Sequence, residues 1–154
     1  MENIFFDYKI DLVSTNEENK LDFKAFEIHD LKSFFNGKIY VFFQYKNKRN
    51  FMILETGIVD YLLQFDDLIL SIEKGIYKTF TISCDYYSNN FLYEYSNVNN
   101  NLTINEGNAN LYTISCDYDD FKKAYLKFRK RTLRELGILY PTLIGNKTFN
   151  EFFL

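Results

Sequence analysis

The residues that could carry chemistry are few and widely spaced in this chain of 154 residues. The single histidine, His29, and the two cysteines, Cys84 and Cys116, fall short of the number and spacing that a structural zinc site requires. One histidine without a Gly-x-Ser-x-Gly motif, and no cysteine in an electropositive setting, also leave no activated nucleophile. The chain has no Gly-rich phosphate loop. We therefore expect neither a metal site nor a cofactor.

Two pairs of adjacent carboxylates, Asp66-Asp67 and Asp119-Asp120, are the remaining candidates for acid–base catalysis. Neighbouring side chains on a helix diverge by about 100°, so the two members of each pair would point in different directions. Such residues fit helix capping and solvation better than paired acid–base work. We predict that the protein is not an enzyme.

A surface that binds another protein is the hypothesis that remains. Tyrosine supplies rigid amphipathic contact area, and carboxylates complement a basic partner. An alternative is that the tyrosines lie in the core or form cross-strand pairs, which we expect for about half of them. The predicted partner-binding residues are Asp66, Asp67, Asp85, Tyr86, Tyr87, Tyr93, Glu94, Tyr95, Asp117, Asp119 and Asp120.

The charges are distributed unevenly along the chain, although the net charge is only −3. Residues 50–120 carry 11 acids and two bases, whereas residues 121–154 carry eight bases and two acids. A region of one sign attracts a partner of the opposite sign, but the two regions could equally neutralise each other within the fold. The basic segment 122–134 leaves a nucleic-acid-associated or regulatory binding module as an alternative function, and the sequence pI near 5.2 argues against nucleic-acid binding.

The N-terminal residues have neither the basic region nor the long apolar run of a signal peptide. No segment approaches the roughly 18 apolar residues that a membrane-spanning helix needs. We therefore expect no membrane association and a cytoplasmic protein with reduced cysteines.

The elements that would position these residues are organised around a segment that occurs twice. The letters TISCDY stand at 81–86 and again at 113–118, and in each copy apolar and polar residues alternate. This period of two predicts strands over about 77–86 and 110–117. The flanking residues do not match, which favours convergence over duplication. If the two strands are neighbours, Cys84 and Cys116 would lie near each other.

Further strands are predicted from the same alternation. Asn36-Gly37 is typical of a type I′ hairpin turn, which would join residues 31–35 to the strand that follows. The polar residues 16–20 are expected to form a turn. The additional predicted strands span residues 4–13, 22–30, 38–45, 51–55, 91–96 and 102–105.

Two segments show helical periodicity instead. An amphipathic helix is predicted near 57–74, where Thr56 would cap the start and Gly75 the end. A second one is predicted near 119–136, capped by Asp117 or Asp119.

Gly137 and Pro141 are expected to end the second helix, and the apolar tail 149–154 is expected to dock on the core. Strands in runs, interrupted by these two helices, predict an α+β fold. We expect one domain over residues 1–154, with a mainly antiparallel sheet of about seven or eight strands.

The order of these elements resembles that of the small acidic immunity proteins of bacterial polymorphic toxin systems. The resemblance covers most of the chain and lies in element order and composition. It implies a non-catalytic, stoichiometric inhibitor that binds a cognate toxin domain and blocks its active site or an essential surface, but it assigns no functional residues. The stretches that carry it are FFDYKIDL, FFNGKIYVFFQY with FMILE, TGIVDYLLQFDDLILSIEKG, and YKTFTISCDYY, FLYEYS and YTISCDYDDFKKAYLKF.

Overall fold

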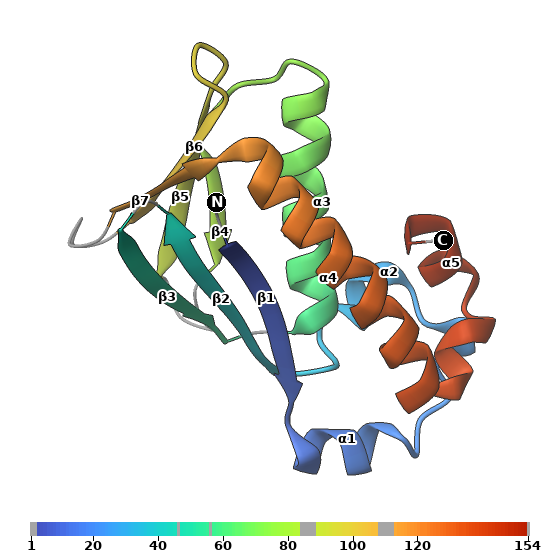
Figure 1. The fold of residues 1–154 in the computed structure, drawn as a ribbon. Coiled ribbons are helices and arrows are strands. Elements are labelled where there is room, and N and C mark those ends of the chain that lie inside the picture. The colour runs from blue at the N-terminus through green and yellow to red at the C-terminus, as the bar shows by residue number, and fades with distance from the viewer. Residues whose placement is uncertain (1–2, 46, 56, 84–88, 108–112, 154) are drawn as a thin grey trace.

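The computed structural model describes residues 3–45, 47–55, 57–83, 89–107 and 113–153. These residues form an α+β fold in which seven strands build two antiparallel sheets, accompanied by five α-helices and two short 3-10 helices (Figure 1). The predicted fold class is confirmed. The strands divide into a sheet of three and a sheet of four.

The three-stranded sheet consists of β1 (Asn3–Ile10), β2 (Gly37–Tyr45) and β3 (Lys48–Leu54), in that order. Phe6, Val41 and Met52 lie opposite one another in register, and all three are buried. Their neighbours along each strand point to the other face, because successive strand side chains alternate.

Residues 11–36 differ from the prediction, since they form no strand. They contain α1 (Leu12–Glu18), η1 (Phe23–Ala25) and α2 (Ile28–Leu31). The expected strand at 22–30 is therefore wrong, and the expected turn at 16–20 is confined to residues 19–20, because α1 extends to Glu18. Since β1 pairs with β2, this segment is the connection between two neighbouring strands.

The predicted hairpin at Asn36-Gly37 is also wrong. Residue 35, a phenylalanine, adopts the left-handed conformation (φ 58°), whereas Gly37 is already part of β2. A Cβ at Gly37 would lie 2.0 Å from the backbone oxygen of Lys9. The glycine is thus needed for close approach of β1 to β2, not for a turn.

The four-stranded sheet has the order β4 (Phe80–Ser83), β5 (Asn90–Ser96), β6 (Asn101–Glu106) and β7 (Thr113–Asp117). The two TISCDY copies supply its edge strands, β4 and β7, which β5 and β6 separate. They are therefore not neighbours. Cys116 is fully buried, and Cys84 lies outside the described residues.

Both predicted amphipathic helices are present as α3 (Ile58–Glu73) and α4 (Tyr118–Leu139). Gly75 follows α3 with φ 79°, as predicted, and Asp117 caps α4 by accepting a 3.0 Å hydrogen bond from the Asp120 amide. Gly57 occupies the N-cap of α3, and Thr56 lies outside the described residues. Gly137 does not end α4, which continues to residue 139.

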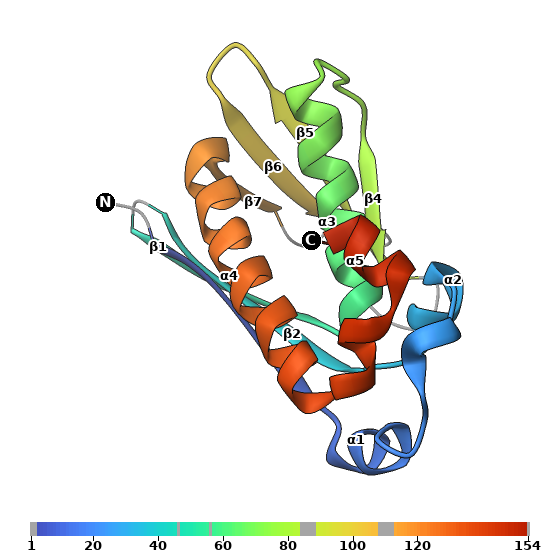
Figure 2. The same cartoon turned by 90° about the vertical axis from the view of Figure 1, so that its right-hand side faces the viewer.

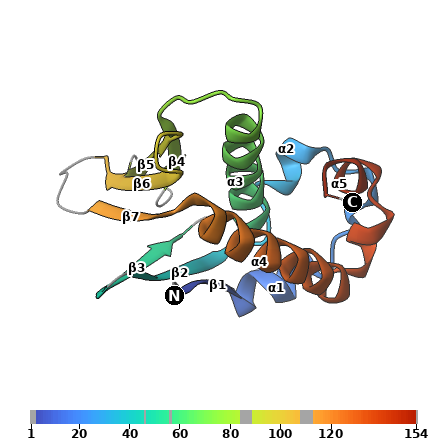
Figure 3. The same cartoon turned by 45° about the horizontal axis from the view of Figure 1, so that its top comes forward.

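The two helices lie beside each other, next to the sheets (Figure 3). Aromatic rings fill the space between them and β1. The Phe6 ring lies 5.8 Å from Phe65 of α3, and 5.5, 5.9 and 5.5 Å from Phe121, Tyr125 and Phe128 of α4. Edge-to-face and stacked pairs at such distances add to the free energy gained by burying the rings.

The C-terminal segment folds back on the 11–36 connection. It contains η2 (Pro141–Gly145) and α5 (Lys147–Phe153), and its Phe149 and Phe153 are buried, as expected for the tail. Buried Asn146 joins the two segments, since its amide nitrogen donates to the backbone oxygens of Phe23 and Phe26. None of the described helices is long and apolar enough to cross a membrane.

Candidate protein-binding site

The adjacent carboxylates of α3 have different environments. Asp66 is held within the fold, where its carboxylate accepts a 2.6 Å hydrogen bond from the Tyr125 hydroxyl and is bound by Arg129 Nε at 2.9 and 3.0 Å. Asp67 is exposed. Only Asp67 of this pair has its carboxylate available to a partner.

The predicted residues of β5 also separate. Tyr93 is fully buried against Phe65 and Phe121, so its assignment to a binding surface is corrected to a core position. Glu94 points the other way and accepts a 3.2 Å hydrogen bond from the Thr79 hydroxyl on the exposed face of the sheet. Three further predicted residues, Asp85, Tyr86 and Tyr87, lie outside the described residues.

Tyr95, by contrast, is brought together with the acidic first turn of α4. Its ring lies 5.0 Å from the ring of Tyr77 and 5.0 Å from that of Tyr118. The Tyr118 hydroxyl donates a 3.1 Å hydrogen bond to Glu73 at the end of α3, and the Lys122 ammonium binds the same carboxylate oxygen. We call these residues, together with exposed Asp119, the acid–tyrosine site: Glu73, Tyr77, Tyr95, Tyr118, Asp119 and Lys122.

Local structure explains how the chain assembles this site. Gly75 lets the backbone reverse after α3, and the Ile76 amide bonds back to the Ser71 oxygen at 2.9 Å, which directs Tyr77 toward β5. Tyr93 and Tyr95 share one face of β5, two residues apart. Tyr93 lies under the helices, whereas Tyr95 lies near the end of the strand and is partly exposed.

Burial and neighbouring charges shift the pKa values of three groups in the site. Burial and the neighbouring Glu73 carboxylate raise the pKa of Tyr118 well above its ordinary value, and burial also raises that of Tyr95. The hydrogen bond from Lys122 lowers the pKa of Glu73. At neutral pH the phenols of Tyr95 and Tyr118 are therefore neutral, and the carboxylate of Glu73 is ionised.

The solvent-facing part of the site is amphipathic. The Tyr77 side chain is 49% exposed, Tyr95 is half-buried, and Asp119 is exposed beside them. The residues predicted from the sequence include Tyr95 and Asp119 but not Glu73, Tyr77 or Tyr118. The sequence predicts that Gly75 ends the helix. A reversal of the chain at this glycine is the signal that could have placed Tyr77 back against the sheet.

A second exposed feature lies on the outer face of the three-stranded sheet. Phe5 and Phe51 are 54% and 53% exposed, and Tyr40 stacks on Phe51 at 5.9 Å. Both rings stand at strand positions that alternate with buried residues, where polar side chains are usual. Their exposure could therefore have been predicted from the sequence.

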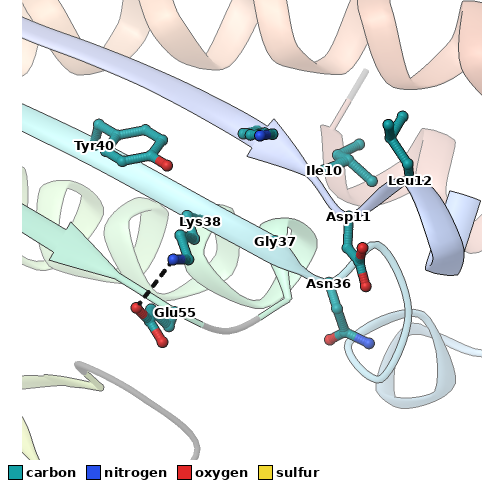
Figure 4. Close-up of a pocket in the computed structure, with 9 residues that line it drawn as sticks. Ile10, Asp11, Leu12, Asn36, Gly37, Lys38, Tyr40 and Glu55 are labelled. Carbon is teal, nitrogen blue, oxygen red and sulfur yellow. Dashed lines mark ion pairs between the residues drawn. The ribbon is translucent and has the colours of Figure 1, made fainter.

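A hollow with a volume of about 450 Å³ lies at one end of this face (Figure 4). The hollow is lined by charges of both signs, and Lys38 and Glu55 form a 3.6 Å ion pair on its wall. Such a mixed lining indicates no single class of ligand. Within the described part of the chain, no group of three or more His, Cys, Asp or Glu side chains could hold a metal ion.

Comparisons with protein-family models, with curated proteins and with solved structures found no match for this chain.

Proposed function

We propose that this protein is a cytoplasmic, non-catalytic immunity protein that binds and neutralises a cognate bacterial toxin domain. The observation that carries the proposal is the acid–tyrosine site, where two accessible tyrosines, Tyr77 and Tyr95, lie beside the carboxylates of Glu73 and Asp119. The identity of the partner class rests on the resemblance of the chain to immunity proteins. A toxin domain with a basic substrate groove would suit this site.

The two kinds of residue are expected to act on different steps of binding. Carboxylates such as Asp119 raise the rate of encounter with a basic surface, and salt screens this effect over about 10 Å at 0.1 M. Tyrosines such as Tyr77 and Tyr95 lose water on contact and hold the formed complex, so they govern the off-rate. Glu73, Tyr95 and Tyr118 stand on α3, β5 and α4, and such placement on regular elements reduces the entropy lost on binding.

The test begins with co-expression of the chain and the product of its neighbouring reading frame. A large secreted protein with a variable C-terminal domain is the expected neighbour. The two should co-purify, and stopped-flow kinetics should show an on-rate that falls with increasing salt. Failure of the C-terminal domain to bind would contradict the proposal.

Variants locate the binding surface. Tyr77→Ala should raise the off-rate at least about tenfold, and Asp119→Lys should lower the on-rate at low salt. Phe51→Ala, which removes an equally exposed ring from the other sheet, is the matched control and should change neither rate by more than about twofold. If Phe51→Ala alone abolished binding, the proposed immunity function would stand. The binding site would then be assigned to the outer face of the three-stranded sheet.

A nucleic-acid-binding function is the alternative, favoured by one feature of α4. Lys123, Lys127, Lys130 and Arg134 are all exposed and recur at helical spacing, so they form a cationic stripe that could follow phosphates. A salt-dependent mobility shift with DNA or RNA would support this function. The absence of a shift at low salt would count strongly against it.

A further inference from the structure

A groove of about 800 Å³ lies between the second half of α4 and the C-terminal segment formed by η2 and α5. Figure 2 shows this segment beside the end of α4. The groove does not include any residue of the acid–tyrosine site. Its lining residues are Lys127, Arg129, Lys130, Arg131, Leu133, Arg134, Gly137, Ile138, Ile144, Phe149 and Phe153.

The floor of the groove is apolar and well supported. The rings of Phe149 and Phe153 are buried 5.1 Å apart, whereas Ile138 and Ile144 are 70% and 58% exposed along the edges. Gly137 allows η2 to approach α4, since a Cβ there would lie only 3.2 Å from Cγ1 of Ile144. Ile138 of α4 and Ile144 of η2 therefore leave aliphatic surface exposed in the groove.

The charged side chains among the described residues that line the groove are all basic. Arg129 and Arg131 are neutralised by carboxylates of the fold, Asp66 and Asp7, each at 2.9 Å. Lys127, Lys130 and Arg134 form no ion pair with any described residue. Spacings of three and four place these three cations on one side of the helix, over about 10 Å of its axis.

We propose that this groove binds an amphipathic helix of a partner protein, with the apolar side of that helix against Ile138 and Ile144 and a row of carboxylates facing the cations of α4. The distribution of the cations favours an acidic amphipathic helix as the bound ligand. They extend along the groove, so they match repeated carboxylates better than the single head group of a fatty acid. Helix-in-groove recognition uses apolar anchors at such spacings.

The floor argues against a nucleic acid in the same place. Stacking of bases requires accessible aromatic faces, but Phe149 and Phe153 are only 2% and 5% exposed. The accessible side chains are the aliphatic Ile138 and Ile144. This proposal goes beyond the immunity function, because its partner is acidic and its surface is separate from the acid–tyrosine site.

The test uses the full chain and synthetic labelled helices of about 18 residues. Three acidic peptides carry a Leu, Phe or Met ridge at helical spacing with glutamates beside it, and matched peptides carry lysines in place of the glutamates. Fluorescence anisotropy at low and high salt measures binding. At least one acidic peptide should bind, more tightly at low salt, and its lysine counterpart should bind at least about tenfold more weakly.

Groove variants then locate the bound peptide. Lys130→Glu combined with Arg134→Glu should weaken binding at least about tenfold, and so should Ile144→Glu alone. Lys123→Glu, an exposed cation of α4 outside the groove, should change it by less than about twofold. Thermal melts establish that each variant is folded.

Several results would overturn the proposal: no binding of any acidic peptide, equal binding of the lysine peptides, or affinity unaffected by the groove variants. Displacement of the acidic peptide by oleate at equal concentration would assign the groove to a single-headed amphiphile instead. Displacement by an oligonucleotide would assign it to nucleic acid.

Discussion

The hydroxyl of Tyr118 donates a 3.1 Å hydrogen bond to the carboxylate of Glu73, which joins the first turn of α4 to the last turn of α3. Lys122, one helical turn after Tyr118, binds the same oxygen. The bond holds the Tyr118 ring against Tyr95 and so supports the exposed part of the acid–tyrosine site.

Glu73→Gln should lower the free energy of unfolding at pH 7 by less than about 1 kcal/mol, because the ion pair is half exposed. Lys122 lowers the folded-state pKa of Glu73 below its ordinary value of 4.5, so this stabilisation is present above pH 4.5 and is lost as the pH falls. Urea unfolding at pH 7 and near pH 3 measures the difference. An equal loss at both pH values would contradict the prediction.

The neighbours Asp66 and Asp67 should respond very differently to the same substitution. Asp66→Asn removes the charge that Arg129 and Tyr125 contact, and should lower the free energy of unfolding by about 1–3 kcal/mol. Exposed Asp67→Asn should change it by less than about 0.5 kcal/mol. Chemical denaturation measures the free energy of unfolding of both variants. Similar losses for the two would show that the Asp66 contacts contribute little to stability.

Buried Glu18 should make the protein less stable as the pH rises. Its carboxylate accepts a 2.7 Å hydrogen bond from the Phe35 amide, but burial raises its pKa above the ordinary 4.5. The folded state therefore binds its proton more tightly than the unfolded state, and stability falls with increasing pH above 4.5.

Glu18→Gln keeps an acceptor for the Phe35 amide and should raise the free energy of unfolding at pH 7, with a smaller effect near pH 4. Glu18→Ala leaves that amide without its acceptor and should lower the free energy by about 1–3 kcal/mol. Urea titrations across this pH range measure both. A glutamine variant that is less stable at pH 7 would show that the ionised carboxylate stabilises the fold.

Cys116 is expected to have a structural role only. It is fully buried on β7, and Cys116→Ala should lower the free energy of unfolding by about 1–3 kcal/mol while partner affinity changes by no more than a few-fold. Denaturation and binding kinetics measured on the same sample separate the two effects. Loss of binding by a fully folded variant would reveal a functional thiol.

The sequence alone determined the elements whose signals are local. The alternation of TISCDY predicts the buried Ile82, Ile114 and Cys116, and the helical stripe of 57–74 predicts α3 with Gly75 beyond its end. These patterns survive because a strand or an amphipathic helix buries one face whatever its neighbours are. The cap at Asp117 is equally local, since its partner is the amide of Asp120.

Only the tertiary structure decided which segments meet. The turn chemistry of Asn36-Gly37 suited a hairpin, but pairing of β1 with β2 used Gly37 for close contact and left residues 11–36 as a helical connection. Periodicity also cannot tell Asp66 from Asp67, because an arginine 63 residues away makes the difference. The acid–tyrosine site likewise depends on Glu73 and Tyr118, 45 residues apart. Such contacts depend on how the elements pack against one another. Local sequence patterns do not show which elements will meet.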